Sequence, residues 1–231
     1  MDRNLTPELM DDPALDPARH GQALRGLARL NRVSGADRIP WHAIRDWARG
    51  SHGPFTLLDV ATGSGDVPLG LAARAGRAGL ELRLHGCDVS PVALEHARER
   101  SHRAGVSFEC IVQDAVHEPF TRRFDVVTCN LFLHHLDEAD AVSLLRNAAA
   151  ACSGLLLVSD LRRDPAGLLL AAAGSRALSR SPVVHVDAVK SVRAAWTPAE
   201  LAGLARRAGL EGFTIGRRFP RRMLLEWRCP R

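Results

Sequence analysis

Short apolar runs alternate with helical patterns through the middle of the chain. Apolar runs without alternation are typical of strands that are covered on both faces. The predicted strands cover residues 55–60, 81–87, 106–112, 124–130 and 155–159, and the predicted helices cover 68–78, 90–104 and 138–152. Strands that alternate with helices are joined by right-handed crossovers, so this pattern predicts a doubly wound, Rossmann-like α/β fold with parallel strands.

The two ends of the chain read differently. Residues 212–218 and 222–228 are strand-like runs with a three-residue connection, which predicts an antiparallel hairpin and a mostly parallel sheet of seven strands. The segment Thr197-Pro198-Ala199-Glu200 has the pattern of a helix N-cap with a capping box. At the other end, residues 1–50 predict a helical extension, with helices over 18–33 and 41–49.

This pattern divides the chain into two parts. We expect an N-terminal helical extension or cap over residues 1–50 and a main domain over residues 51–231. Within the main domain, residues 162–196 contain helical patches and a loop at Ser181-Pro182, and their apolar character suggests an insertion that covers the substrate.

Composition adds few constraints. Of the 231 residues 46% are hydrophobic and 25% charged, which is ordinary for a globular domain. The net charge of +5 is diffuse, and no nucleic-acid partner is expected. No close cysteine pair and no Cys/His ligand spacing occur, so we expect free thiols, a cytoplasmic protein and no metal site. The polar N-terminus is no signal peptide, and no apolar stretch is long enough to span a membrane.

The segment most informative for function is the glycine-rich loop after the first predicted strand. It reads Asp59-Val60-Ala61-Thr62-Gly63-Ser64-Gly65-Asp66, and its glycines allow close approach to a ligand at the carboxyl end of the strand. A dinucleotide usually requires a third glycine, but Pro68 stands there, and Asp66 would repel a diphosphate. S-adenosylmethionine (SAM) has no phosphate, so acidic groups are acceptable beside it.

Two further acids end the next two strands. Asp88 can accept hydrogen bonds from ribose hydroxyls, and Asp114 can accept one from an adenine amine. Three acids at the ends of successive strands, together with a glycine loop, favour SAM over a nicotinamide dinucleotide.

This constellation resembles the class I SAM-dependent methyltransferases over residues 55–160, although Ala61 replaces the first glycine of their loop. The resemblance implies that Asp59 and the backbone of Ala61, Thr62, Gly63 and Gly65 hold the methionine end. It assigns Asp88 to the ribose, with Val89 beside the adenine, and it assigns Asp114 and Ala115 to the adenine. Asn130 and Leu131, after the fourth strand, would lie near the methyl group.

A shorter resemblance concerns Asn31-Arg32-Val33-Ser34-Gly35, followed by Arg38 and Trp41. It is similar to the N-terminal segment of the quinone-biosynthesis (ubiquinone and menaquinone) methyltransferases, which closes over the cofactor pocket. Arg32 would then pair with the SAM carboxylate; the alternative is a surface arginine at a helix end.

Three histidines are candidates for a general base in methyl transfer to oxygen. His134 and His135 follow the fourth strand, where they could equally serve packing, and His185 lies in the region expected to cover the acceptor. That apolar region favours a small aromatic or lipophilic acceptor such as a phenol, hydroquinone or polyketide-type ring. O-methylation is slightly favoured over C-methylation of a quinone-type ring.

Other functions and partners stay open. An RNA methyltransferase would need a basic face with stacking aromatics, yet only 5% of residues are aromatic. An NAD-dependent oxidoreductase and a non-catalytic SAM-fold protein are further alternatives. The C-terminal arginines could contact an anionic membrane or simply protect a hairpin edge; they are Arg217, Arg218, Arg221, Arg222, Arg228 and Arg231.

Overall fold

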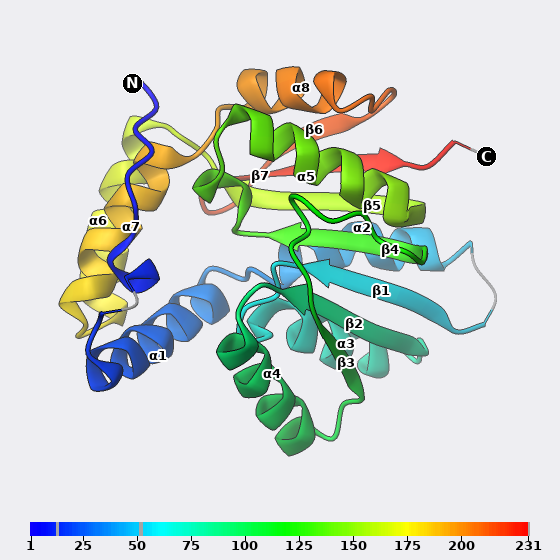
Figure 1. The fold of residues 1–231 in the computed structure, drawn as a ribbon, viewed down its shortest axis with the longest axis horizontal. Helices are drawn as coiled ribbons and strands as arrows, with labels where there is room; N and C mark the ends of the chain where they lie inside the picture. Colours follow the sequence, from blue (N-terminus) through cyan, green and yellow to red (C-terminus); the bar gives the residue numbers. More distant parts are fainter. Residues whose placement is uncertain (13, 51–52, 231) are drawn as a thin grey trace.

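A seven-stranded sheet organises the molecule. The computed structural model describes residues 1–12, 14–50 and 53–230. The strand order is β3-β2-β1-β4-β5-β7-β6, in which the first five strands are parallel and β7 pairs antiparallel with both β5 and β6. The predicted mostly parallel α/β sheet with an antiparallel C-terminal hairpin is therefore confirmed (Figure 1).

The elements follow one another in the order that the sequence pattern predicts. The strands are β1 (Phe55–Val60), β2 (Leu82–Asp88), β3 (Phe108–Val112), β4 (Phe124–Asn130), β5 (Cys152–Leu161), β6 (Thr214–Arg218) and β7 (Arg222–Arg228). The helices are η1 (Leu9–Asp11), α1 (Pro17–Val33), α2 (Arg38–Ala48), α3 (Asp66–Arg77), α4 (Pro91–Ala104), η2 (Leu133–His135), α5 (Glu138–Ala151), α6 (Pro165–Leu178), α7 (Pro182–Ala194) and α8 (Pro198–Arg207).

Helices cover both faces of the sheet. One apolar cluster joins α5 and α8 to one face through buried side chains such as Leu144, Leu204 and Val127. A second cluster joins α2 and α3 to the other face, for example through Ile44 and Leu71. Burial on both faces explains why the strands of the sheet centre read as continuous apolar runs.

A third group of helices lies beyond the carboxyl ends of the parallel strands. Helices α1, α6 and α7, together with the N-terminal segment of residues 1–12, form what we call the helical cap (Figure 1). Its small core contains Ala23, Val183 and Val184. The N-terminal extension and the region 162–196 thus pack against each other at the sheet edge where ligands bind in open α/β folds.

Several predicted boundaries are wrong by a few residues. The residue Cys152 begins β5 rather than ending the preceding helix, and α2 begins at Arg38 rather than at Trp41. The predicted loop is confirmed at Ser181, which lies between α6 and α7 and is the N-cap of α7, whereas Pro182 already begins that helix. Cooperative tertiary contacts, which propensity does not encode, extend or trim each element.

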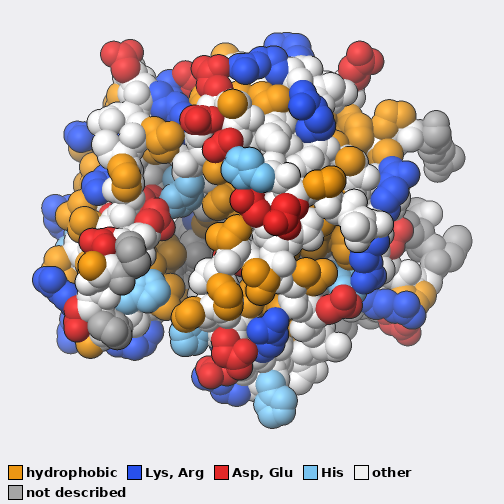
Figure 2. All heavy atoms as spheres, in the orientation of Figure 1, with side chains coloured by type: hydrophobic (Ala, Val, Ile, Leu, Met, Phe, Trp, Pro, Cys, Tyr) orange, Lys and Arg blue, Asp and Glu red, His pale blue; other side chains and the backbone are white. Residues whose placement is uncertain are grey.

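The C-terminal arginines do not form one exposed run. Arg222 is only 5% exposed, and Arg218 pairs with Glu226 at 2.6 Å. Arg221 lies 3.8 Å from Asp164, and Arg231 falls outside the described residues. Figure 2 likewise shows Lys and Arg side chains interspersed with acidic ones on the face it presents. Among the described helices, none is long and apolar enough to cross a membrane.

Gly154 allows a close approach between β5 and its neighbours. A Cβ atom there would lie 2.7 Å from the carbonyl oxygen of Asp125 and 2.8 Å from the Trp47 ring. We therefore expect Gly154→Ala to lower the free energy of unfolding by about 1–3 kcal/mol in urea unfolding. Gly174→Ala is the control, because a Cβ on this α6 residue meets nothing within 4 Å. Gly174→Ala should raise the free energy of unfolding by about 0.5–1 kcal/mol. Equal effects of the two variants on this free energy would contradict the packing argument.

Candidate functional site

The glycine-rich loop turns sharply between β1 and α3. Gly63 and Gly65 have φ of 52° and 76°, and Ala61 adopts the same left-handed region with φ of 53°. The left-handed region is where glycine is at ease and alanine is strained, which explains why the resembling family has glycine at this position. Strain kept at such a loop is a mark of a functional site.

Asp59 lies beneath this loop rather than at its surface. Its side chain is buried and accepts hydrogen bonds from Thr62 Oγ1 at 2.9 Å, Thr128 Oγ1 at 2.6 Å and Asn130 Nδ2 at 2.9 Å. Burial raises the pKa of Asp59 to about 6, although the three hydrogen bonds act in the opposite direction. The carboxylate therefore joins the ends of β1 and β4 and orients the polar side chains above it.

Asp88 connects two loops at the end of β2. It accepts hydrogen bonds from the backbone N–H of Gly63 at 2.8 Å and of Ser90 at 2.9 Å. Each oxygen of the Asp88 carboxylate accepts one N–H and keeps a free lone pair, so each could also accept a hydrogen bond from a ribose hydroxyl. Beside it, Val89 is 63% exposed and Val112 at the end of β3 is 55% exposed. Two exposed apolar side chains at neighbouring strand ends are suited to the face of an adenine ring.

Asp114 has local partners at the end of β3. One oxygen accepts from the N–H of Val116 at 2.9 Å, and the other lies 2.9 Å from Nδ1 of the exposed His117. The hydrogen bond from His117 is the main cause that lowers the pKa of Asp114. Ala115 is buried, and its carbonyl accepts from Asn147 Nδ2 at 3.0 Å. An adenine amine would have to share the Asp114 carboxylate with His117.

The end of β4 offers an unpartnered acceptor. Asn130 Oδ1 is buried and has no hydrogen-bond partner among the described residues. Leu131, the next residue, has a strained φ of 56° and donates its N–H to the carbonyl of Ser159 at 2.8 Å. A buried oxygen without a donor is costly, so its position suits a cationic or N–H-bearing group of a ligand. The hydrogen-bond acceptors at these strand ends thus fit the ammonium, the ribose hydroxyls and the adenine amine of SAM.

The structure does not bring Arg32 to these strand ends. Arg32 is an exposed residue of α1 and lines a groove of about 410 Å³ between α1, α3 and α4. The groove also contains Asp66, which is paired with Arg100. None of the other residues expected to bind the cofactor lines this groove. The assignment of Arg32 to the SAM carboxylate stays a prediction that this arrangement does not favour.

His134 is held tightly in a charged pair. Its Nδ1 lies 2.7 Å from Asp160 Oδ1, and its backbone N–H donates to Asp160 Oδ2 at 2.9 Å. Burial acts to lower the pKa of His134, but the charge of Asp160 and the hydrogen bond with it outweigh burial and raise the pKa to about 10. His134 therefore carries a proton at neutral pH and is poorly suited to accept another.

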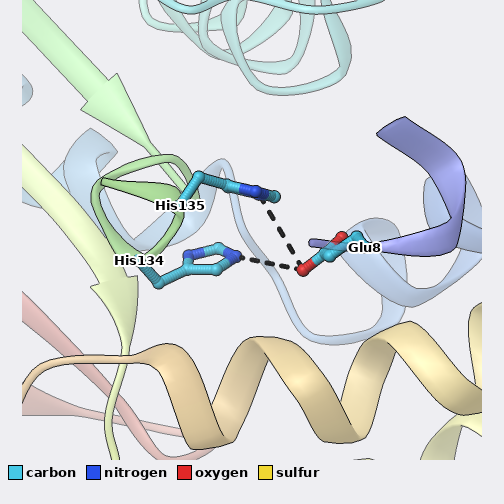
Figure 3. Close-up of side chains that lie close together, drawn as sticks. All are labelled: Glu8, His134 and His135. Carbon is cyan, nitrogen blue, oxygen red and sulfur yellow. Dashed lines mark ion pairs between the residues drawn. The ribbon is translucent and has the colours of Figure 1, made fainter. Parts of the chain in front are cut away.

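Glu8 of the N-terminal segment faces both histidines. Figure 3 shows its carboxylate facing the edges of the two neighbouring imidazoles. Its Oε1 lies 3.7 Å from His134 Nε2 and 3.9 Å from His135 Nε2. Burial acts to raise the pKa of Glu8, but the histidine contacts outweigh it and hold the pKa below its ordinary value. The ligating atoms of these three residues lie within 4.8 Å of one another, so they could also hold a cation.

A cavity of about 420 Å³ lies between the N-terminal segment and the histidine pair. Its lining combines the two histidines and acids with apolar and small residues, namely Leu5, Thr6, Pro7, Glu8, Asp11, His134, His135 and Ala194. The His135 side chain is 27% exposed, against 5% for that of His134. His135 is thus the more accessible imidazole in this cavity.

His185 does not line that cavity. Its Nε2 lies 2.8 Å from the carbonyl oxygen of Ser179, so the ring fastens the end of α6 to the start of α7. Its assignment as a base stays a prediction, and the geometry gives it a structural role in the helical cap.

Sequence reasoning placed the N-terminal segment in the extension of residues 1–50 but missed the contacts that its side chains make. Arg3 stacks 3.4 Å from the centroid of the Trp196 ring and donates to the carbonyls of Leu136 and Ala194 at 2.6 Å. Asp187 of α7 accepts from the N–H groups of Leu9 and Met10 at 2.8 and 3.0 Å. No local signal distinguishes Arg3 or Glu8 from other polar residues, because their partners lie more than 100 positions away along the chain.

Comparison with sequence families and curated proteins finds similar methyltransferases. A family model described as "Methyltransferase domain" matches residues 57–153, which run from β1 into β5. The "Ubiquinone biosynthesis O-methyltransferase" of Ralstonia nicotianae is 34% identical over 184 residues, or 74% of this chain and 72% of that protein. The chain spans only 62–64% of the lengths of four further relatives with that name.

Solved structures share the fold. The plantazolicin methyltransferase BpumL, solved with a substrate analogue and SAH, superposes with a TM-score of 0.69 at 15% identity and covers 94% of this chain and 92% of its own. The SAM-dependent methyltransferase SibL superposes with a TM-score of 0.68 at 21% identity over 99% of this chain and 64% of its own. Identities this low establish the similarity of fold alone.

The buried His134–Asp160 pair makes stability depend on pH. Because folding raises the pKa of His134, the pair stabilises the protein fully below about pH 6.5, and this contribution is lost as the pH rises through about 10. Asp160→Asn should lower the free energy of unfolding by about 3–5 kcal/mol at pH 6.5, with a smaller loss at pH 10.5. Urea unfolding at both pH values measures this. Asp114→Asn, which removes an exposed histidine partner, should cost little at either pH; a pH-independent loss in Asp160→Asn would refute the pairing.

Proposed function

The chain belongs to the class I SAM-dependent methyltransferases, and we propose from its site that it methylates an oxygen of a small, lipophilic, hydroxylated aromatic acceptor such as a phenol, a hydroquinone or a polyketide-type ring. The observation that carries this proposal is the cavity of about 420 Å³ that contains His135 together with Leu5, Pro7 and Ala194. A largely apolar chamber with one accessible imidazole suits a flat ring whose hydroxyl must lose a proton.

The strand ends hold the methyl donor. Asp88 would accept the ribose hydroxyls, Val89 and Val112 would contact the adenine, and Asn130 Oδ1 would accept from the ammonium. SAM supplies an electrophilic methyl group on a sulfonium. The protein's contribution is to fix the donor and acceptor in line and to exclude water, because alignment lowers the entropic part of the barrier.

Within the acceptor cavity, the two histidines have different roles. His134, kept protonated by Asp160, holds the Glu8 carboxylate in place. His135 then accepts the proton from the acceptor hydroxyl at its Nε2, and the neighbouring Glu8 carboxylate stabilises the imidazolium that forms. The helical cap, which includes the N-terminal segment, would cover the acceptor, and this supports the covering role of residues 162–196. The division at residues 50 and 51 stays a prediction, because α2 packs on the sheet and not in the cap.

C-methylation of a quinone-type ring is the second candidate. The relatives named for ubiquinone biosynthesis are O-methyltransferases, which favours methylation of oxygen. The same base could also serve C-methylation, because removing the hydroxyl proton makes the neighbouring ring carbon nucleophilic. The position of the new methyl group decides between the two. Incubating the protein with isotopically labelled SAM and 4-alkylcatechols, followed by mass spectrometry and NMR of the product, tests the proposal. No transfer to any ring acceptor, despite SAM binding, would oppose it.

Asp88 should contribute strongly to donor affinity. Asp88→Ala removes a charged acceptor for the ribose hydroxyls, so we expect S-adenosylhomocysteine (SAH) to bind about 1.5–3 kcal/mol more weakly in calorimetry. Glu81→Ala, which removes an exposed acid just before β2, is the control and should leave the affinity unchanged. A folded Asp88→Ala protein with wild-type affinity would remove Asp88 from the site.

Replacing His135 should affect chemistry rather than donor binding. His135→Gln keeps a polar side chain but cannot accept the proton, so kcat should fall by about 10²–10⁴-fold with the SAH affinity unchanged. His185→Gln is the comparison, since the geometry gives it a structural role only. An equal loss of kcat in His185→Gln, or none in His135→Gln, would contradict the assignment.

A further inference from the structure

Arg222 occupies an unusual position at the carboxyl edge of the sheet. It is the first residue of β7, and because β7 is antiparallel, this residue lies beside Leu161 at the end of β5. Its side chain is 5% exposed, although its neighbours Arg217 and Arg221 reach the surface. The chain therefore buries one arginine of its basic C-terminal run at the edge where the donor and acceptor would lie.

The guanidinium of Arg222 has one neutral partner. Its Nη2 donates to Ser34 Oγ at 2.7 Å, while Nη1 is buried without a hydrogen-bond partner among the described residues. Asp160, whose charge acts on Arg222, is already engaged by His134 and by the N–H of Leu161. Burial lowers the pKa of Arg222 to about 10, so it is still a cation at neutral pH. A buried cation without an anion is costly unless a ligand supplies one.

Two further buried polar atoms without described partners lie on the adjacent strands. Ser159 Oγ on β5 is one, and Asn130 Oδ1 on β4 is the other. Asn130 pairs with Ser159 in the sheet register, and Ser159 pairs with Leu224, two residues from Arg222 on β7. Paired residues share a face of the sheet, as do residues two apart, so all three side chains project to the same face.

The three orphaned groups have complementary chemistry. A guanidinium N–H and a hydroxyl donate to a carboxylate, whereas an amide oxygen accepts from an ammonium. An α-amino acid group carries both charges on one carbon. The loop of residues 34–37, which follows α1, lies over this place through the Ser34–Arg222 bond.

We propose that Arg222 and Ser159 form a carboxylate-binding site where the carboxyl end of β5 meets the start of β7, and that Ser34 holds the Arg222 guanidinium in place. Two ligands of the proposed reaction could supply the carboxylate: the amino-acid end of the methyl donor, which Asn130 favours through its ammonium, or an acidic group on the acceptor ring. The inference rests on the proposed function, and it gives to Arg222 the role that the resemblance to the quinone-biosynthesis methyltransferases suggests for Arg32.

Calorimetry with matched ligands tests the site. The Arg222→Met protein should bind SAH about 10- to 100-fold more weakly than wild type, because one charge-assisted contact is lost. Its affinity for 5′-methylthioadenosine, which lacks the amino-acid end, should stay within about two-fold of wild type. Ser159→Ala should weaken SAH binding about 3- to 10-fold. Arg217→Met, which removes an exposed arginine of the same hairpin, should change neither affinity.

The comparison of ligands separates this site from a structural role. If Arg222 only held the loop at Ser34, the affinities for SAH and for 5′-methylthioadenosine would fall equally in Arg222→Met, and the proposal would fail. Met is apolar and of similar length, so the ligand-free variant should unfold at the same or a higher temperature. If that variant does not fold, Ser159→Ala provides the same comparison.

A second pair of ligands identifies the source of the carboxylate. If SAH binding is unchanged in Arg222→Met, the SAH-loaded protein is titrated with 3,4-dihydroxybenzoate and with catechol. Loss of affinity for the benzoate alone assigns the site to the acceptor. If Arg222→Met weakens the binding of neither SAH nor 3,4-dihydroxybenzoate, the proposal is overturned. If the wild-type protein binds no SAH at all, the proposed function fails instead, which keeps the two results distinct.

Discussion

The buried carboxylate of Asp59 holds the working edge of the sheet together. Its three side-chain hydrogen bonds join the loop after β1 to the end of β4, so the polar groups of both strands converge on one place. A charge in this position is tolerated because each oxygen is satisfied, and burial still raises its pKa to about 6. The strained backbone at Ala61 and Leu131 lies on either side of this network, so the network fixes the conformation that a ligand meets.

In the proposed reaction, the helical cap would enclose the acceptor at this edge. Residues from the N-terminus, from α7 and from the turn after β4 meet around Glu8 and the histidine pair. Ion pairs join Glu8 to the two histidines, a hydrogen bond from Ser191 joins it to α7, and a cavity remains beside them. The same charges set the division between the imidazoles: the proton on His134 is stabilised by Asp160, while His135 stays accessible. In the proposed reaction, acceptor recognition would therefore depend on contacts between segments far apart in the sequence.

Much of the site could be predicted because its residues are local to strand ends. Asp59, Asp88 and Asp114 each end a strand whose apolar run is readable, and parallel strands bring their carboxyl ends to one edge. Other residues could not be predicted in this way. Arg222 looked like part of a solvated hairpin and is buried. The assignment of Arg32 to a carboxylate stays a prediction; Arg32 lines a groove that also contains Asp66, the last residue of the glycine-rich loop. The charge of Asp66, which would repel a diphosphate, is compensated by Arg100 from α4.

The sequence by itself determined the order of strands and helices, the parallel sheet with its antiparallel hairpin and the acids at the strand ends, because hydrophobic periodicity and turn chemistry act over a few residues. Only the tertiary structure decided which polar groups lack partners and which are paired. Arg222, Ser159 and Asn130 become a set when β4, β5 and β7 lie side by side. Glu8 meets His134 and His135 across more than 100 residues, since burial and charge pairing are properties of the packed chain and not of any short segment.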